Sequence, residues 1–182
     1  IDERRQAKET PDDLLDMLMS LTYDDGSVME QEDLLDEILI LFIAGHETTS
    51  NALTFTAQLL AHHPEYQRKI KEEASSFSAD TLVDILQHTQ QVEYVINESM
   101  RMYPPVYFID RVSKVAFDHK GLHFPEDTTL LFSLYEMHRL ENKWQDPQEF
   151  KPERFATDKN FSDQFFPFGA GPRKCIGNNF AM

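Results

Sequence analysis

The spacing of apolar residues changes along the chain and divides it into a helical part and a strand-rich part. Up to Met102 the apolar positions recur every three or four residues, which is the period of an amphipathic helix. Beyond Pro105 they occur in short runs of β-branched and aromatic residues separated by Gly, Pro and Asp, a pattern typical of short strands. We therefore predict a mainly α-helical fold with a small β-sheet.

The longest predicted helix follows a turn at Asp24–Gly26. Ser27 and Glu30 have the spacing of a capping box, in which the side chain of each residue bonds the backbone N–H of the other. From Leu34 to Leu59 apolar or small residues then recur at steps of three or four. These signals predict one helix of about 30 residues.

The other predicted elements are shorter. Thr10 is expected to cap a helix that has Pro11 in its first turn and passes through Leu14 and Leu21. A final helix is expected to open at Cys175. Further helices are predicted from Pro64, over Ala79–Leu86 and over Thr89–Met102, and strands over Val106–Ile109, Val112–Phe117, Leu122–Phe124 and Thr128–Leu134.

Composition narrows the class of protein. The chain has 182 residues, 41% of them hydrophobic and 12% aromatic, which is the composition of a folded domain rather than of a disordered chain. Its net charge of −15 argues against a nucleic-acid partner and against docking on an acidic membrane. The single cysteine excludes an internal disulfide and any metal cluster that needs several cysteines.

Apolar runs in the chain are too short for a membrane-spanning helix. The longest, Ile38–Ala44, has seven residues, whereas a spanning helix needs about 20. A cytoplasmic location is therefore the expectation for this stretch. The chain opens at Ile1 and closes at Met182 inside an expected helix, so we expect residues 1–182 to be one partial domain of a longer protein. A membrane anchor upstream stays an open alternative.

Small and polar residues interrupt the apolar face of the long predicted helix. Gly45 and Thr48 lie on this face, although a glycine inside a helix costs ~1 kcal/mol relative to alanine. A close helix crossing, with Thr48 bonded to its own helix, is one explanation. A functional notch beside the Glu47 carboxylate is the other. Zinc is disfavoured, because His46 and Glu47 begin an H-E-x-x-H pattern in which position 50 is Ser.

The segment Phe168–Gly177 carries the most specific signal. Gly169 and Gly171 allow a positive φ or a close approach of the backbone to a flat ligand. Cys175 directly follows the cations Arg173 and Lys174, and nearby positive charge favours the thiolate form of cysteine. A small buried hydrophobe is the ordinary alternative for a lone cysteine, and no histidine carries a local signature of a base for a thiol nucleophile. A metal held by one thiolate inside a planar cofactor fits a single cysteine best.

Two further charged groups predict no function by themselves. Glu98 and Arg101 are three residues apart in a predicted helix, which is the spacing of an ordinary surface ion pair worth roughly 0.3–0.5 kcal/mol. Pro152–Phe155 is typical of a turn with exposed charges.

All these motifs together resemble, in their order along the chain, those of the cytochrome P450 family of haem-thiolate monooxygenases. Ala44–Thr49 resembles the oxygen-activation motif, Glu98-x-x-Arg101 the E-x-x-R pair, Pro152–Phe155 the P-E-R-F segment and Phe168-x-x-Gly171-x-Arg173-x-Cys175-x-Gly177 the haem-binding loop. The resemblance implies an incomplete cytochrome P450 fold, namely its C-terminal half, with haem b (iron protoporphyrin IX) as the cofactor.

The resemblance also implies roles for single residues. Cys175 would be the axial ligand of the haem iron, and Arg173 and Arg111 would bind the haem propionates. Thr48 would donate a hydrogen bond during oxygen activation, and Glu47 would assist proton delivery. The other residues at the cofactor would be Ala44, Gly45, Phe168, Gly169, Gly171 and Gly177. Glu98, Arg101 and Arg154 would form a buried charge network, and Val106, Tyr107 and Phe108 would line the substrate pocket.

The function implied by the resemblance is that of a monooxygenase. It would insert one atom of O2 into an apolar organic substrate, such as a fatty acid, with electrons from an NAD(P)H-dependent reductase, separate or fused. Two alternatives stay open: a haem-thiolate isomerase or peroxygenase that needs no reductase, and a non-catalytic truncated chain. Retention of Glu47 and Thr48 favours oxygen activation, because relatives that need no reductase commonly lose this threonine.

Overall fold

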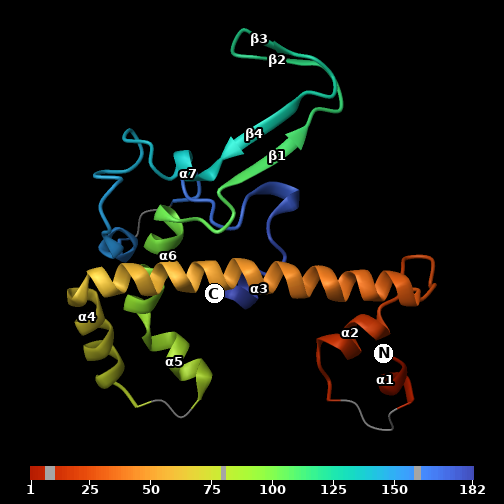
Figure 1. Cartoon of the computed structure of the whole chain (residues 1–182), viewed down its shortest axis with the longest axis horizontal. Helices are drawn as coiled ribbons and strands as arrows, with labels where there is room; N and C mark the ends of the chain where they lie inside the picture. The colour runs from red at the N-terminus through yellow and green to blue at the C-terminus, as the bar shows by residue number, and fades with distance from the viewer. Residues whose placement is uncertain (7–10, 79–80, 158–160) are drawn as a thin grey trace. The chain divides into compact units, whose positions relative to one another are not determined.

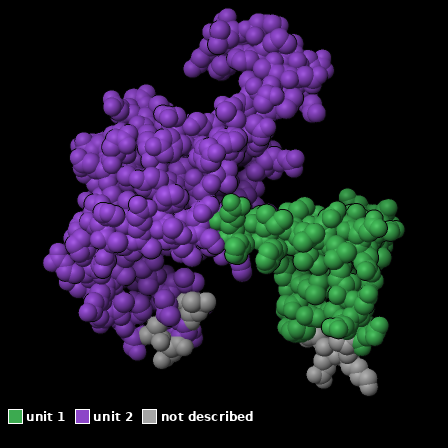
Figure 2. Space-filling view, viewed as in Figure 1, with its two compact units in different colours: residues 1–47 green, residues 48–182 purple. Residues whose placement is uncertain are grey.

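The computed structural model describes residues 1–6, 11–78, 81–157 and 161–182. The chain forms two compact units, residues 1–47 and 48–182, shown in green and purple in Figure 2. Helices make up most of the described chain, and short strands occur in the second unit (Figure 1). The predicted class, mainly α with a small amount of β-sheet, is confirmed.

The elements have the following bounds. The helices are α1 (Asp2–Gln6), α2 (Leu14–Ser20), α3 (Gln31–His62), α4 (Pro64–Ser75), α5 (Leu82–His88), α6 (Gln90–Met102), α7 (Leu134–Met137) and α8 (Asn178–Ala181), with the 3-10 helices η1 (Pro152–Ala156) and η2 (Gly171–Arg173). The strands are β1 (Phe108–Val112), β2 (Phe117–His119), β3 (Leu122–Phe124) and β4 (Thr129–Ser133). In the part of the chain that the structure describes, no helix combines the length and apolarity needed to cross a membrane.

A charge cluster joins α1 to α2 in the first unit. The Arg4 guanidinium lies 2.9 Å from carboxylate oxygens of both Asp13 and Asp16. Asp13 is also the N-cap of α2, since its side chain accepts the Asp16 N–H at 3.1 Å. This cap begins the helix three residues after Pro11, so the predicted start is wrong. Thr10, the predicted cap, lies outside the described residues.

The long helix α3 has the predicted length but not the predicted cap. It contains 32 residues and begins at Gln31, so Glu30 rather than Ser27 precedes it. The Ser27 hydroxyl instead donates to the Asp25 carboxylate at 2.6 Å, inside the preceding turn. Gly26 has a φ of 83° there, which the predicted turn requires. The turn is confirmed, and the predicted capping box is wrong because the turn uses its serine.

The apolar core of the second unit surrounds α6. Its buried members come from α3, α4, α6 and the segment before η1, and they are Leu59, Tyr66, Val95, Met102 and Phe150. Both α4 and η1 pack on α6, which is buried from Glu98 to Met102. The predicted bounds of α6 are confirmed to within one residue, and α4 begins at Pro64 as predicted, because proline fits the first helical position.

The helix predicted over Ala79–Leu86 is present but lies closer to the C-terminus. The Thr81 hydroxyl accepts the Asp84 N–H at 3.2 Å, and the Asp84 carboxylate accepts the Thr81 N–H at 3.1 Å. This capping box begins α5 at the next residue. Ala79 lies outside the described residues.

The strands form two antiparallel pairs rather than one sheet. β1 pairs with β4, and β2 pairs with β3 (Figure 1). Lys120 and Gly121 connect β2 to β3 with φ values of 49° and 81°, the two positive angles of a type I′ hairpin turn. The ladder of β1 continues through Asp110 and Arg111 opposite β4, so the predicted break after Ile109 is wrong.

The predicted helix opening at Cys175 is also wrong. α8 begins three residues later and has Gly177 as its N-cap. Cys175 lies in the loop between η2 and α8, where its N–H donates to the Phe168 carbonyl at 2.9 Å.

Candidate functional site

A fully buried ion pair lies near the C-terminal end of α6. The side chains of Glu98 and Arg101 have no exposed surface, and their spacing brings them together on one face of the helix. Arg101 Nε donates to Glu98 Oε2 at 2.7 Å and Arg101 Nη2 donates to Glu98 Oε1 at 2.9 Å, which makes a two-bond fork. The surface ion pair that the spacing alone suggests does not form.

Arg101 also gathers backbone carbonyls from a segment with little regular structure. Its Nη1 donates to the carbonyls of His138 and Pro147, both at 2.9 Å, and its Nη2 donates to the Glu149 carbonyl at 3.3 Å. The Trp144 ring lies 5.3 Å from the guanidinium carbon. Because buried carbonyls need hydrogen-bond donors, this guanidinium orders the chain from residue 138 to residue 149.

Arg154, from η1, completes the buried network. Its Nε donates to Glu98 Oε1 at 3.0 Å, and the Lys151 N–H donates to the same oxygen at 2.9 Å. Its Nη2 donates to the carbonyls of Asp146 and Glu149 at 2.8 and 3.2 Å. The three side chains that the resemblance assigns to one network thus meet on a single carboxylate.

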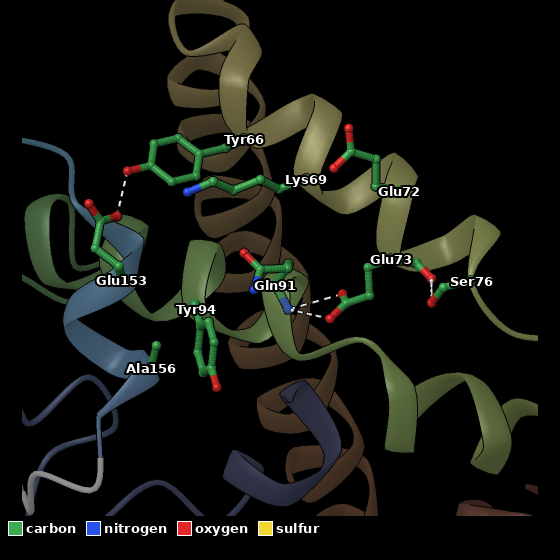
Figure 3. Close-up of a pocket in the computed structure, with 9 residues that line it drawn as sticks. All are labelled: Tyr66, Lys69, Glu72, Glu73, Ser76, Gln91, Tyr94, Glu153 and Ala156. Carbon is green, nitrogen blue, oxygen red and sulfur yellow. Dashed lines mark hydrogen bonds between the residues drawn. The ribbon is translucent and has the colours of Figure 1, made fainter.

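A hollow of about 440 Å³ lies between α4, α6 and η1 (Figure 3). On one side of it the Tyr66 hydroxyl donates to Glu153 Oε2 at 2.5 Å, and burial, followed by this hydrogen bond, raises the pKa of the phenol. On the other side both Glu73 carboxylate oxygens accept the Gln91 N–H at the start of α6. These contacts hold α4 against η1 and α6, and no local sequence signal predicts them because the partners are distant in sequence.

His138, just after α7, is a buried residue that the sequence motifs do not mark. Its Nε2 accepts the Phe166 N–H at 2.9 Å, and its ring has no exposed surface. Burial, and next the charge of Arg101, lower the pKa of His138 to about 4. The imidazole is therefore neutral at pH 7.

The loop that carries Cys175 turns back on itself. Gly169 and Gly171 both have a φ of 72°, the left-handed region that glycine enters without steric cost. Cys175 and Arg173 are both exposed. In this structure the cysteine is therefore not a small buried hydrophobic residue, which was the ordinary alternative. The backbone bonds that close the loop run from Gly169 N to Phe166 O at 3.0 Å, from Lys174 N to Gly171 O at 3.1 Å and from Cys175 N to Phe168 O at 2.9 Å.

The small-residue segment of α3 is open around its glycine. Ala44, Gly45 and Glu47 belong to the first unit and are exposed, whereas Thr48 belongs to the second unit and is half-buried. Among the described residues, no packing neighbour lies within 4 Å of the position that a Cβ of Gly45 would occupy.

The residues proposed for substrate and propionate binding lie on or before β1. Val106, Tyr107 and Phe108 are exposed, and of these Tyr107 lines a hollow of about 460 Å³. That hollow is also bounded by Asn51, Phe55, Tyr103, Pro104, Pro105 and Tyr135. The exposed Arg111 donates from Nη1 to the Asp110 carbonyl at 2.6 Å.

Comparison with known proteins identifies the family. The family model for cytochrome P450 matches residues 1–182. The chain belongs to the cytochrome P450 family. Cytochrome P450 3A13 of Mus musculus is 32% identical over 98% of this chain, and cytochrome P450 3A40 of Oryzias latipes is 37% identical over 85% of it. The structure described as retinoic acid bound cyanobacterial CYP120A1 matches 99% of this chain with a TM-score of 0.92 at 29% identity.

Each of these P450 matches covers only part of the relative. The chain spans 37% of the mouse protein, 32% of the Oryzias protein and 43% of the cyanobacterial chain. The predicted fold, an incomplete cytochrome P450, is confirmed by the structural match. Members of this family carry haem as their cofactor.

The residues around Cys175 fit a haem group. An accessible thiol can act as the axial ligand of a haem iron. The porphyrin itself provides the equatorial ligands, so a site for haem needs no cluster of protein ligands. Open space also surrounds the Cβ positions of Gly169 and Gly171, which lets a flat group approach the backbone.

Glu98→Gln tests the buried network. This change preserves the shape of the side chain but leaves the Arg101 charge buried without its partner, so the free energy of unfolding should fall by roughly 3–5 kcal/mol. Glu149→Gln is the matched control, since the Glu149 carboxylate is exposed and pairs only with Lys151 among the contacts described; its cost should stay below about 1 kcal/mol. Urea unfolding measures both, and equal losses would contradict a network that depends on burial.

His138 should make stability depend on pH. Its folded pKa of about 4 lies below the ordinary value of about 6.5, so on acidification the unfolded chain binds the proton first. The contribution, about 3 kcal/mol, is complete above pH 6.5 and is lost as the pH falls toward 4. Unfolding curves of wild type and His138→Gln at several pH values isolate this contribution from that of the carboxylates. If the free energies of unfolding of wild type and His138→Gln change by the same amount between pH 6.5 and pH 4, His138 does not make this contribution.

Proposed function

We propose that this chain is the C-terminal haem-binding part of a monooxygenase that inserts one atom of O2 into an apolar organic substrate and reduces the other atom to water. The observation that carries this proposal is the exposed Cys175 thiol, held by a loop with two positive-φ glycines in a member of the cytochrome P450 family. An NAD(P)H-dependent reductase, separate or fused, would supply the electrons.

Several residues of the loop would bind the cofactor. The Cys175 thiolate would be the axial ligand of the iron, and a thiolate-bound haem supplies the activation of O2. The exposed Arg173 guanidinium would pair with a propionate, and Arg111 on β1 would pair with the other. The half-buried Phe168 would pack beside the haem, and Gly177 would give the chain room between the thiol and α8.

The long helix α3 would supply the residues for proton transfer. The half-buried Thr48 hydroxyl would donate a hydrogen bond at the site of oxygen binding. The exposed Glu47 carboxylate would take up a proton from solvent and pass it inward. Gly45 has no side chain and Ala44 has only a methyl group, so these two residues would leave room for O2 and substrate.

An apolar organic molecule is the substrate that we propose, with a fatty acid as one member of that class. The hollow lined by Phe55, Tyr103, Tyr107 and Tyr135 offers such a molecule aromatic and apolar walls. A relative from Mesocricetus auratus, 36% identical over 80% of this chain, is named lithocholate 6-beta-hydroxylase, and the cyanobacterial structure is described as retinoic acid bound. Val106 and Phe108 would extend the same wall.

Thiolate ligation is tested by the absorption spectrum of the ferrous carbon-monoxide complex after addition of haem. Wild type should give a strongly red-shifted Soret band, because a thiolate donates electron density to the iron, and Cys175→Ala should lose it. Lys114→Ala, which removes an exposed cation outside the loop, should retain the band. A wild-type chain without this band would refute haem binding by this chain and favour a non-catalytic truncated product.

Oxygen activation is tested by Thr48→Ala in the complete enzyme. Loss of the hydroxyl should uncouple NAD(P)H consumption from product and release peroxide, because the proton no longer reaches the oxygen bound at the site. Thr54→Ala is the control, since this exposed threonine of the same helix bonds only its own backbone in the contacts described. If NAD(P)H consumption stays coupled to product formation in Thr48→Ala, the proposed role of Thr48 is wrong and a peroxygenase or isomerase is favoured.

A further inference from the structure

His138 contacts both the buried ion network and the chain that leads to Cys175. Its carbonyl accepts a hydrogen bond from Arg101 Nη1 at 2.9 Å. Its ring accepts the Phe166 N–H at Nε2, also at 2.9 Å, across 28 residues of sequence. The Phe165 ring lies beside the imidazole, with 5.2 Å between the ring centroids. A single residue therefore connects α6 to the loop that begins at Phe165.

Hydrogen bonds continue from this contact to the cysteine. The Phe166 carbonyl accepts the Gly169 N–H at 3.0 Å, and the Phe168 carbonyl accepts the Cys175 N–H at 2.9 Å. The position of Phe166 therefore determines where the turn at Gly169 begins, and that turn determines where the thiol is held. A shift of the Phe166 amide would be transmitted to Cys175 through the backbone.

The contact requires a hydrogen-bond acceptor at the position of Nε2. Since the Phe166 amide donates, Nε2 carries no proton and the neutral ring has its proton on Nδ1. Nδ1 is buried and has no partner among the described residues. A ring that only filled space would not need this unpaired nitrogen, because a leucine fills a similar volume without it. The acceptor at Nε2 is what the imidazole adds.

We propose that His138 is a positioning residue for the thiolate loop, and that it acts by holding the Phe166 amide rather than by touching the haem. Its effect on haem ligation rests on the function proposed above, whereas its effect on the loop does not. Arg101 and Arg139 are the charged side chains whose fields act on the ring, and both remain in the variants below.

Amide hydrogen exchange of the 182-residue chain tests the contact without haem. His138→Leu removes the acceptor, so exchange at Phe166 and Cys175 should become at least about tenfold faster. In His138→Gln the amide oxygen reaches the place of Nε2, and exchange should return to within about threefold of wild type. His138→Asn is too short to reach it and should behave like His138→Leu.

Leu134→Ala is the control for a general loss of packing. Leu134 is as buried as His138, lies one helical turn before it and donates no hydrogen bond to the loop among the contacts described. In Leu134→Ala, hydrogen exchange at the Phe166 amide should rise no more than exchange at amides across the whole second unit. If His138→Leu shows the same uniform rise, or if His138→Gln and His138→Asn behave alike, His138 does not position the loop. His138→Asn replaces the leucine variant in this comparison if that variant does not fold.

Haem titration adds a spectroscopic readout. With haem bound, His138→Leu should lose at least about half of the red-shifted carbon-monoxide band while His138→Gln retains it, because a displaced Cys175 ligates the iron less completely. A wild-type chain that lacks the band refutes the proposed function, yet the exchange experiment still decides the role of His138. A wild-type band that both variants keep in full overturns the positioning of the ligand.

Discussion

The arrangement of the second unit depends on one buried guanidinium. A charge without exposed surface is tolerated in a protein interior only where an opposite charge and enough hydrogen-bond acceptors meet it. Arg101 is such a charge. It forms an ion pair with Glu98 on the same helix and donates hydrogen bonds to three carbonyls from the chain between residues 138 and 149. Arg154 then binds the same carboxylate from η1. Segments that are distant in sequence are therefore held together by one set of polar contacts.

Polar contacts and aromatic rings, rather than a periodic apolar face, order the region after β4. The Trp144 ring stacks on Phe161 with 5.3 Å between centroids, and Phe155 lies 5.0 Å from Phe165. Large flat side chains bury much area with few rotatable bonds, so a short aromatic cluster can pack against the buried network without regular secondary structure. The loop that carries the cysteine follows directly on Phe165, which is a member of this cluster.

The sequence predicts those parts of the fold in which neighbouring residues decide the outcome. The periods of α3 and α6 and the proline at Pro64 were sufficient because burial of one helix face and the geometry of proline are local rules. Ser27 failed as a cap because Asp25, equally close in sequence, competes for its hydroxyl. In the site, the spacing of Arg101 and its partner gives no sign of burial, and only the family resemblance suggested it. His138 has no local signal because its amide partner is 28 residues away.

The carbonyls bound by Arg101 also fix a length. Those of His138, Pro147 and Glu149 stand at set intervals along the chain and converge on one guanidinium, so one residue more or fewer between them would leave a buried donor or acceptor unmatched. The hairpin turn at Lys120 and Gly121 carries no comparable requirement in the described structure, because it is exposed and closes only on its own strands. Insertions and deletions during evolution should therefore accumulate at the hairpin and avoid the stretch from 138 to 149. The Arg101 guanidinium thus constrains how many residues the chain can have between positions 138 and 149.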